Sequence, residues 1–290
     1  MGPDPKKPAG EPTVALLLTW FVPGAGHLYL GRVRFAVAAF VVVEGLYLLG
    51  ILLSGGMFLE YLPKEMWTTF AAALTPEAGN LGMLLYHVQQ YGYGPGQPRP
   101  WPPTMDLGTL LTSTSGVLNA FVMARAHLDA RIPDRSHSDV PDPVFCSLAT
   151  WLVPGLGQWL QGRRRRAIIC FVMLVGMFLF GTMLAQGINL DRERHFYYWA
   201  GQFLLGIPAV LAEFINGHPR METDVAYGDA GIVLGSVAGM LNILVMLDAF
   251  TWSEKKLLPQ EKEPVRRGAR TSAPAPGSSA SPLPETEQSS

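Results

Sequence analysis

Long apolar runs, separated by short polar stretches, dominate the pattern of this chain. Phe35 to Leu53 holds one charged residue, Glu44, while Ala167 to Gly187 and Ala230 to Leu247 hold none. Runs of about 18 or more apolar residues have the length that a helix needs to cross a bilayer. A fourth run, Leu107 to Ala124, is richer in Thr and Ser, which the interiors of membrane helix bundles accept. The pattern predicts an all-α integral membrane protein with about four full transmembrane helices.

The chain also repeats itself. The 18 residues that begin at Thr19 and the 18 that begin at Thr150 are identical at ten positions without a gap. Such a match indicates a tandem duplication, in which each half contains a Pro-Gly element, a basic turn, a helix, an irregular stretch and a second helix. The predicted segments are an N-terminal tail at 1–12, a first membrane unit at 13–126, a linker at 127–144, a second membrane unit at 145–252 and a disordered cytoplasmic tail at 253–290.

Each half contains an apolar segment that is broken by proline and glycine. These breaks comprise Pro23, Gly24 and Gly26 in the first half, and Pro154, Gly155 and Gly157 in the second. Proline removes a backbone donor, and lipid tolerates such a break only where other protein groups or water satisfy the backbone. Broken helices line ligand and ion sites in some transporters. A tight bend between two helices is the simpler interpretation, and we favour it.

The distribution of basic residues favours four spans with both termini in the cytoplasm. Cytoplasmic segments are enriched in Lys and Arg, and this topology places 17 of the 22 on the inside. A six-span topology, in which the Pro-Gly elements cross the membrane, places 14 inside, and an eight-span topology places 8 inside. Two semi-apolar segments, Met66–Val88 and Phe196–Ile215, are either interfacial helices or weak spans. A reporter fused after Arg131 separates four spans from six.

The residues Trp20-Phe-Val-Pro-Gly-Ala-Gly-His27-Leu-Tyr29-Leu-Gly31-Arg32 carry a resemblance to a known group. This pattern resembles the signature of bacterial two-transmembrane-domain proteins and their uncharacterised relatives, here in two tandem copies. The resemblance implies a multi-pass protein of the bacterial inner membrane with no general enzymatic activity. It also implies a first segment that crosses the membrane, against the four-span topology.

Basic clusters follow both Pro-Gly elements. They comprise Arg32 and Arg34 in the first half, and Arg163, Arg164, Arg165 and Arg166 in the second. Basic residues beside a membrane helix bind anionic lipid headgroups or act as ordinary topology anchors, and we favour anchoring. His27 titrates near neutral pH in its unperturbed form, but its repeat partner is Gln158, so hydrogen bonding within an interface fits this position better than catalysis.

The last helix of each half presents a stripe of small residues. Gly231, Gly235 and Gly239 are spaced four apart, and Asn119 and Asn242 lie near the corresponding faces. Small residues at this spacing let helices approach closely. We therefore predict that the two helices pack on each other or across a dimer, with the two Asn side chains hydrogen-bonded inside. An Asn that lines a polar pathway is the alternative.

A few isolated polar residues remain as candidates. Glu44 lies inside a predicted span, where a charge is expensive and often functional, but its repeat counterpart is Val175. Asp106 and Asp229 each begin a helix and are predicted to cap it. The cysteines, Cys146 and Cys170, lie far apart and are interpreted as small buried hydrophobes.

Three classes of function are compatible with the sequence. We favour a membrane scaffold or accessory protein that is not an enzyme, because the repeated residues are those that make bends, anchors and close packing. A small transporter or channel that uses the broken segments and Glu44 is the alternative, and a lipid-modifying enzyme is ranked last. No cofactor or metal is expected. The expected partners are the bilayer, anionic lipids, and a membrane protein or a second copy of the chain; the net charge of −1 argues against nucleic acid.

Overall fold

The computed structural model describes residues 10–62, 64, 69–93, 100–132, 139–217 and 225–258. The disordered tail was predicted at 253–290; its part from 259 onward, most of the N-terminal tail and part of the linker lie outside the described residues. The prediction is wrong for residues 253–257, which continue the last long helix to Leu257, since Glu and Lys are good helix formers. Within the described ranges the secondary structure is helical, with no strand. The prediction of an all-α membrane protein with a duplicated unit is therefore confirmed.

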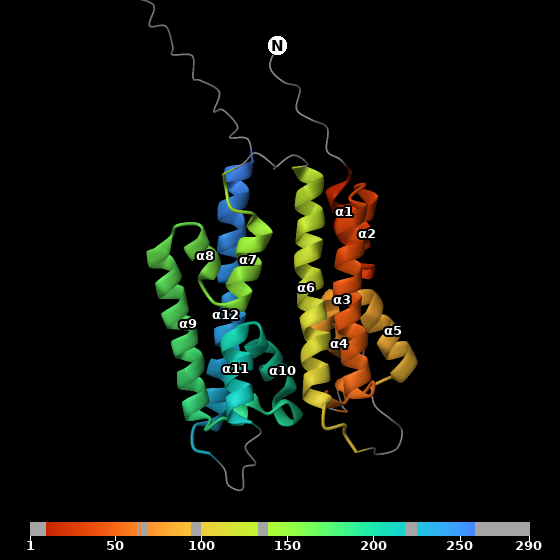
Figure 1. The fold of residues 1–290 in the computed structure, drawn as a ribbon. Coiled ribbons are helices and arrows are strands. Elements are labelled where there is room, and N and C mark those ends of the chain that lie inside the picture. The colour runs from red at the N-terminus through yellow and green to blue at the C-terminus, as the bar shows by residue number, and fades with distance from the viewer. Residues whose placement is uncertain are drawn as a thin grey trace, which may run out of the picture. The chain divides into compact units, whose positions relative to one another are not determined.

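Four helices are long and apolar enough to cross a membrane among the described residues. They are α3 (Val33–Ser54), α6 (Met105–Arg131), α9 (Arg164–Leu184) and α12 (Gly228–Leu257). In each of these continuous helices the backbone N–H and C=O groups pair with one another, as a lipid environment requires. In Figure 1, α3 and α9 descend from the end that carries the N-terminal hairpin, and α6 and α12 return to it. Each half therefore begins and ends at the same end of the bundle.

The Pro-Gly elements are short helical hairpins. In the first half α1 (Pro12–Phe21) turns back into α2 (Ala25–Tyr29), and in the second half α7 (Pro143–Leu152) turns back into α8 (Leu156–Leu160). At about 1.5 Å per residue, the ten-residue arms reach only about 15 Å, half the thickness of the hydrocarbon core. Both hairpins lie in the upper half of Figure 1, so they enter and leave from one end.

The semi-apolar segments form short broken helices near the opposite end of the bundle (Figure 1). They are η1 (Phe58–Tyr61), α4 (Thr69–Ala73), η3 (Pro76–Gly79) and α5 (Leu81–Tyr91) in the first half, and η4 (Ile188–Leu190), α10 (Arg192–Phe203) and α11 (Ile207–Asn216) in the second. None of these helices has the length of a span. Short broken segments thus enter each half from both ends.

Small residues do bring helices together, but not the two helices that the stripe predicted. In the first half, a Cβ added at Gly50 of α3 would lie 2.6 Å from Thr112 of α6. In the second half, a Cβ added at Gly231 of α12 would overlap the carbonyl of Gly181 on α9. Direct packing of α6 on α12 within one chain, the first of the two predicted arrangements, is wrong, because an apolar groove of about 410 Å³ separates them. Packing across a dimer stays a prediction. Helical spacing identifies the close-packing face, but not the neighbour that fills it.

The two halves meet through aromatic side chains. The rings of Phe121 on α6 and Trp151 on α7 lie 6.1 Å apart, and Trp151 also contacts Phe203 on α10. Nearer the other end, Tyr61 stacks on Phe196 at 5.9 Å. These residues belong to one buried apolar cluster that spans both halves. Burial of aromatic surface therefore joins the halves along a seam.

Candidate functional site

The Pro-Gly turns are fixed by backbone geometry that favours glycine. Gly24 and Gly155 have φ values of +82° and +84°, in the left-handed region. A Cβ at either position would also overlap a carbonyl at the start of the following long helix, that of Ala36 or Ala167 respectively. The same turn is therefore built twice, and it sets the angle between each hairpin and its long helix.

Asn119 of α6 holds the first broken hairpin. A helix would normally satisfy the Thr19 carbonyl with the N–H of the residue four positions on, but that residue is Pro23, which has none. The Asn119 side-chain amide donates to the Thr19 carbonyl at 2.9 Å and to the Gly79 carbonyl at 2.9 Å. The Thr19 hydroxyl in turn accepts from the Gly26 N–H. One side chain thus joins the two broken segments that enter from opposite ends.

Asn242 of α12 does the same work in the second half. Its amide donates to the Thr150 carbonyl at 3.2 Å and to the Leu204 carbonyl at 2.9 Å. Pro154 lies four residues after Thr150, as Pro23 does after Thr19, and the Thr150 hydroxyl accepts from the Gly157 N–H. Both Asn side chains are buried and hydrogen-bonded inside the bundle, and each amide donates to the broken segments of its own half rather than to the other Asn.

An ion pair joins the Gly-Arg turn of the first half to α6, the last helix of that half. The Arg32 guanidinium contacts the carboxylate of Asp129 on α6, and His27 Nε2 lies 3.7 Å from the same carboxylate. His27 and Asp129 are both fully buried. Burial and the nearby Arg125 lower the pKa of Arg32 from its ordinary value. His27 therefore lies in a structural interface, at the base of the hairpin.

An equivalent ion pair joins the Gly-Arg turn of the second half to α12, but its acid lies at a different position of the repeat. Arg163 Nη2 lies 2.7 Å from the carboxylate of Asp248 on α12, and Arg166 lies 3.1 Å from it. Gln158, the repeat partner of His27, donates to Asp248 at 3.2 Å. By the repeat offset Asp248 corresponds to Arg125, one helical turn before Asp129. The ion pair is retained although its acid has moved by one turn.

These ties divide the predicted lipid-contacting arginines into two groups. Arg32, Arg163 and Arg166 bind acids of their own half, although the Arg166 side chain is also exposed. Arg34, Arg164 and Arg165 are exposed at the hairpin end. The guanidinium of Arg164 also lies 5.5 Å from the ring centre of Trp159, a pairing typical of the membrane interface. The exposed three remain the candidates for lipid headgroups.

At the opposite end, a buried ion pair lies on the seam between the halves. Arg192 Nε donates to Glu213 at 2.6 Å, and its Nη1 donates to the Asp106 carbonyl of the first half at 2.5 Å. The Asp106 carboxylate accepts from the Tyr61 hydroxyl at 2.6 Å. The predicted capping role of Asp106 is wrong, since Thr104 occupies the N-cap and the carboxylate turns toward Tyr61.

The first half also buries two carboxylates next to the point where its broken segments meet. Glu77 of η3 is fully buried and accepts hydrogen bonds from the Thr112 hydroxyl at 2.8 Å and the Ser113 hydroxyl at 2.7 Å. Glu44 of α3 is 8% exposed and accepts from the amide of Asn80 at 3.4 Å. Glu44 stood out in the sequence. Glu77 did not, because it lies in a weakly apolar segment beside a proline.

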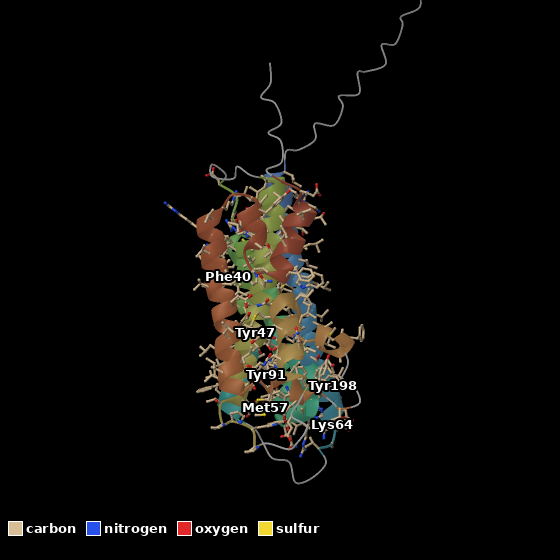
Figure 2. The ribbon with its side chains drawn as sticks, turned by 90° about the vertical axis from the view of Figure 1, so that its right-hand side faces the viewer. Phe40, Tyr47, Met57, Lys64, Tyr91 and Tyr198 are labelled. Carbon is tan, nitrogen blue, oxygen red and sulfur yellow. The ribbon has the colours of Figure 1, made fainter. Side chains whose placement is uncertain are left out.

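Two further buried polar side chains, Tyr47 and His87, belong to the same region. We call Glu44, Glu77, Tyr47, Asn80 and His87 together the acidic pocket. Tyr47 of α3 is fully buried, and its hydroxyl has no hydrogen-bond partner among the described residues. In Figure 2 it lies between the labelled Phe40 and Met57. His87 of α5 is also fully buried, and its ring centre lies 6.5 Å from that of Tyr47. Burial lowers the pKa of His87 to about 4, so its imidazole is neutral at physiological pH.

Comparison with known proteins places both halves in one family. The sequence model of a family of unknown function, DUF6677, matches residues 14–136 and 145–262. The chain belongs to this family. No curated protein and no solved structure matches the chain. The tandem DUF6677 match follows the duplication in the sequence, and it adds no activity to transfer.

The two DUF6677 units differ most at their titratable positions. Gly116 of α6 packs on the backbone of Pro76 and Glu77, and the equivalent Gly239 of α12 packs on Gly201 and Gln202. Gln202 is therefore the structural counterpart of Glu77. This comparison extends a trend: the first unit has His27, Glu44 and Glu77 where the second has Gln158, Val175 and Gln202. At these three positions, neutral side chains of the second unit replace titratable groups of the first.

The second unit satisfies its counterpart of the acidic pocket with neutral amides. The Asn189 amide donates to Gln202 Oε1 at 2.8 Å, and Gln202 donates back to the Asn189 carbonyl at 2.8 Å. Gly235 of the predicted stripe faces this amide pair, and a Cβ there would lie 3.2 Å from Gln202. The fold thus accommodates a neutral side chain at the position of Glu77.

Proposed function

We propose that this protein is a non-enzymatic scaffold or accessory protein of the cell membrane. The observation that carries the proposal is the use of the residues that both halves share. Asn119 and Asn242 hold the broken segments, Gly24 and Gly155 shape the turns, and every one of these residues acts on its own half. Duplicated residues that maintain architecture, rather than a reaction centre, are what a scaffold requires.

The proposed binding surface is the seam on the side of α11. An apolar groove of about 530 Å³ runs along it, and its lining residues come from both halves: Leu110, Thr114, Leu118, Leu148, Trp151, Leu152, Phe203, Gly206, Ile207, Val210, Leu211 and Phe214. The α11 helix presents Phe214, 88% exposed, at this groove. We propose that an apolar transmembrane helix of a partner protein lies along it, since helices in lipid associate through such packing.

Site-specific photocrosslinking in cells tests this function. A photoreactive amino acid at Phe214 should form an adduct with one discrete membrane protein. The same residue at Met173, an exposed position on α9 away from the seam, is the matched control and should form no such adduct. Adducts with lipid alone at both positions would contradict the scaffold proposal.

The orientation proposed from the basic residues belongs to the same account. With both termini in the cytoplasm, the exposed Arg34, Arg164 and Arg165 lie at the inner surface, where anionic lipids attract them. Anionic vesicles should therefore bind the protein's inner end more tightly than neutral ones.

Transport of a small cation is the second candidate, and one specific observation favours it. The broken segments of the first half enter from opposite ends and are joined by Asn119, and the buried Glu77 lies two residues before one of the joined carbonyls. Broken helices beside a buried acid are the arrangement that ion transporters use. A cation flux in reconstituted vesicles that disappears in Glu77→Gln would promote this candidate over the scaffold.

A further inference from the structure

Two carboxylates inside a membrane bundle require compensation for their charge. An ionised carboxylate in an apolar interior is costly unless it is paired, protonated or bound to a cation. Glu213 in the second half meets this need through Arg192. Among the described residues, no Lys or Arg forms an ion pair with Glu44 or Glu77. These two acids need a neutralising positive charge that the described part of the chain does not provide.

The polar groups around the two acids are the kind that bind hard cations. Tyr47, whose hydroxyl is buried and has no hydrogen-bond partner among the described residues, lies three residues after Glu44, on the same face of α3. The α6 helix contributes the hydroxyls of Thr112, Ser113 and Ser115. Oxygen ligands of this type suit a proton or a hard metal cation, and they do not suit soft metals. The unpartnered hydroxyl marks a position where a ligand would complete the pocket.

The polar groups in contact with the two acids come from α3, α6 and the segment that joins η3 to α5. Helix α3 provides Glu44 and Tyr47, η3 provides Glu77, the start of α5 provides Asn80, and α6 provides hydroxyls only. Helix α5 also provides His87, whose ring lies beside that of Tyr47 and which burial keeps neutral. The pocket therefore has acids but no resident cation among the described residues.

The second half indicates that the acids are not needed for folding. At the position of Glu77 it has Gln202, and at the position of Glu44 it has Val175, yet the helices around them pack in the same order. A neutral side chain could replace each acid, and each acid costs stability when it is ionised. Their presence in the first half is therefore best explained by a function that uses their charge.

We propose that Glu44 and Glu77 form a binding site for one small monovalent cation, either a proton or a sodium ion. Tyr47, Asn80 and the α6 hydroxyls complete the site. This site is where the cation of the proposed transport function would bind. The binding proposal rests on the transport function only for the movement of the ion, because a cation can bind without being transported.

The stability of the purified full-length protein tests this site. The melting temperature is measured in sodium chloride and in choline chloride of equal ionic strength, at about pH 8 and about pH 5. Saturation by a bound ligand should raise the wild-type melting temperature by on the order of 5 °C. A rise with sodium at about pH 8 identifies sodium as the ligand, and a rise with acid alone identifies the proton.

Matched variants make the result specific to the two acids. Glu77→Gln, which copies the second half, and Glu44→Gln should both lose the cation-dependent rise. Asp229→Asn, which removes an exposed carboxylate far from the pocket, should retain it. An equal rise in all four proteins, or no rise in the wild type under either condition, would overturn the proposal.

A second measurement uses only the wild-type protein and does not depend on the folding of a variant. A lipid-soluble carbodiimide modifies protonated carboxyl groups, and mass spectrometry of peptides locates the adduct. Glu44 or Glu77 should be modified more at acid pH, with protection by sodium if sodium binds, and lack of any modification at acid pH would also overturn the site. If binding is present but vesicles show no cation flux, the transport candidate fails while the site stands.

Discussion

Replacing Asn119 with Ala should destabilise the protein more than any ordinary change on the same helix. The variant removes the side-chain donor from the buried carbonyl of Thr19 and from the half-buried carbonyl of Gly79. A buried acceptor that loses its partner costs about 1–3 kcal/mol, although hydrogen bonds in membrane proteins average nearer 0.6 kcal/mol. The two carbonyls and the cavity together should cost about 2–4 kcal/mol.

The control for this prediction is Thr114→Ala on the same helix. The Thr114 hydroxyl donates to the Leu110 carbonyl of its own helix at 2.6 Å. That carbonyl keeps its helical N–H donor when the hydroxyl is removed, so the loss should stay below about 0.5 kcal/mol. Unfolding of both variants is followed in mixed micelles as the fraction of denaturing detergent rises. Equal losses for Asn119→Ala and Thr114→Ala would refute the role of Asn119 as the tie between the broken segments.

Three other outcomes are expected. Gly24→Ala should lower stability by about 2 kcal/mol or more, because its Cβ meets the Ala36 carbonyl at a positive φ, and a thermal melt measures this loss. Arg192→Met should cost about 3–5 kcal/mol, because it leaves Glu213 buried and unpaired, whereas the double variant Arg192→Met/Glu213→Leu should recover most of the loss in the same melt. A reporter enzyme that works only in the cytoplasm should be active when it is fused after Arg131. Activity there of a reporter that works only outside the cell would support six spans.

Much of the architecture could be predicted from apolar runs and the internal repeat. The four long helices follow from sequence because a span must satisfy its own backbone, so each one is a continuous apolar stretch. The Pro-Gly breaks were equally visible, since Pro23 and Pro154 interrupt such stretches. These features depend on neighbours in sequence, and a local pattern captures them.

The contacts of the polar residues could not be predicted in the same way. The spacing of Asn119 places it near a close-packing face, but its partners, Thr19 and Gly79, lie in segments 100 and 40 residues away. Glu77 was missed because its segment is weakly apolar and its hydrogen-bond donors belong to α6. An alignment of this segment with the second half would have paired Glu77 with Gln202, a signal that two diverged sequences carry only faintly.

The structure also clarifies why the two halves differ. Glycine, proline and asparagine are shared where they shape or hold the backbone, as at Gly24 and Asn119. At three equivalent positions the first half has the titratable His27, Glu44 and Glu77, and the second half has neutral side chains. The duplicated architecture therefore appears twice, and the acidic pocket appears once. A scaffold function uses the first property, and cation binding uses the second.

The most direct test of the account is the sidedness of the first hairpin. Single cysteines are placed at Glu11 and at Arg34, the two exposed positions that flank it, in a background without Cys146 and Cys170. A membrane-impermeant maleimide is then applied to intact cells and to inverted vesicles. We expect both cysteines to react from the same side, in inverted vesicles only. Reaction of one cysteine from each side would show that the Pro-Gly element crosses the membrane, and would contradict the four-span architecture.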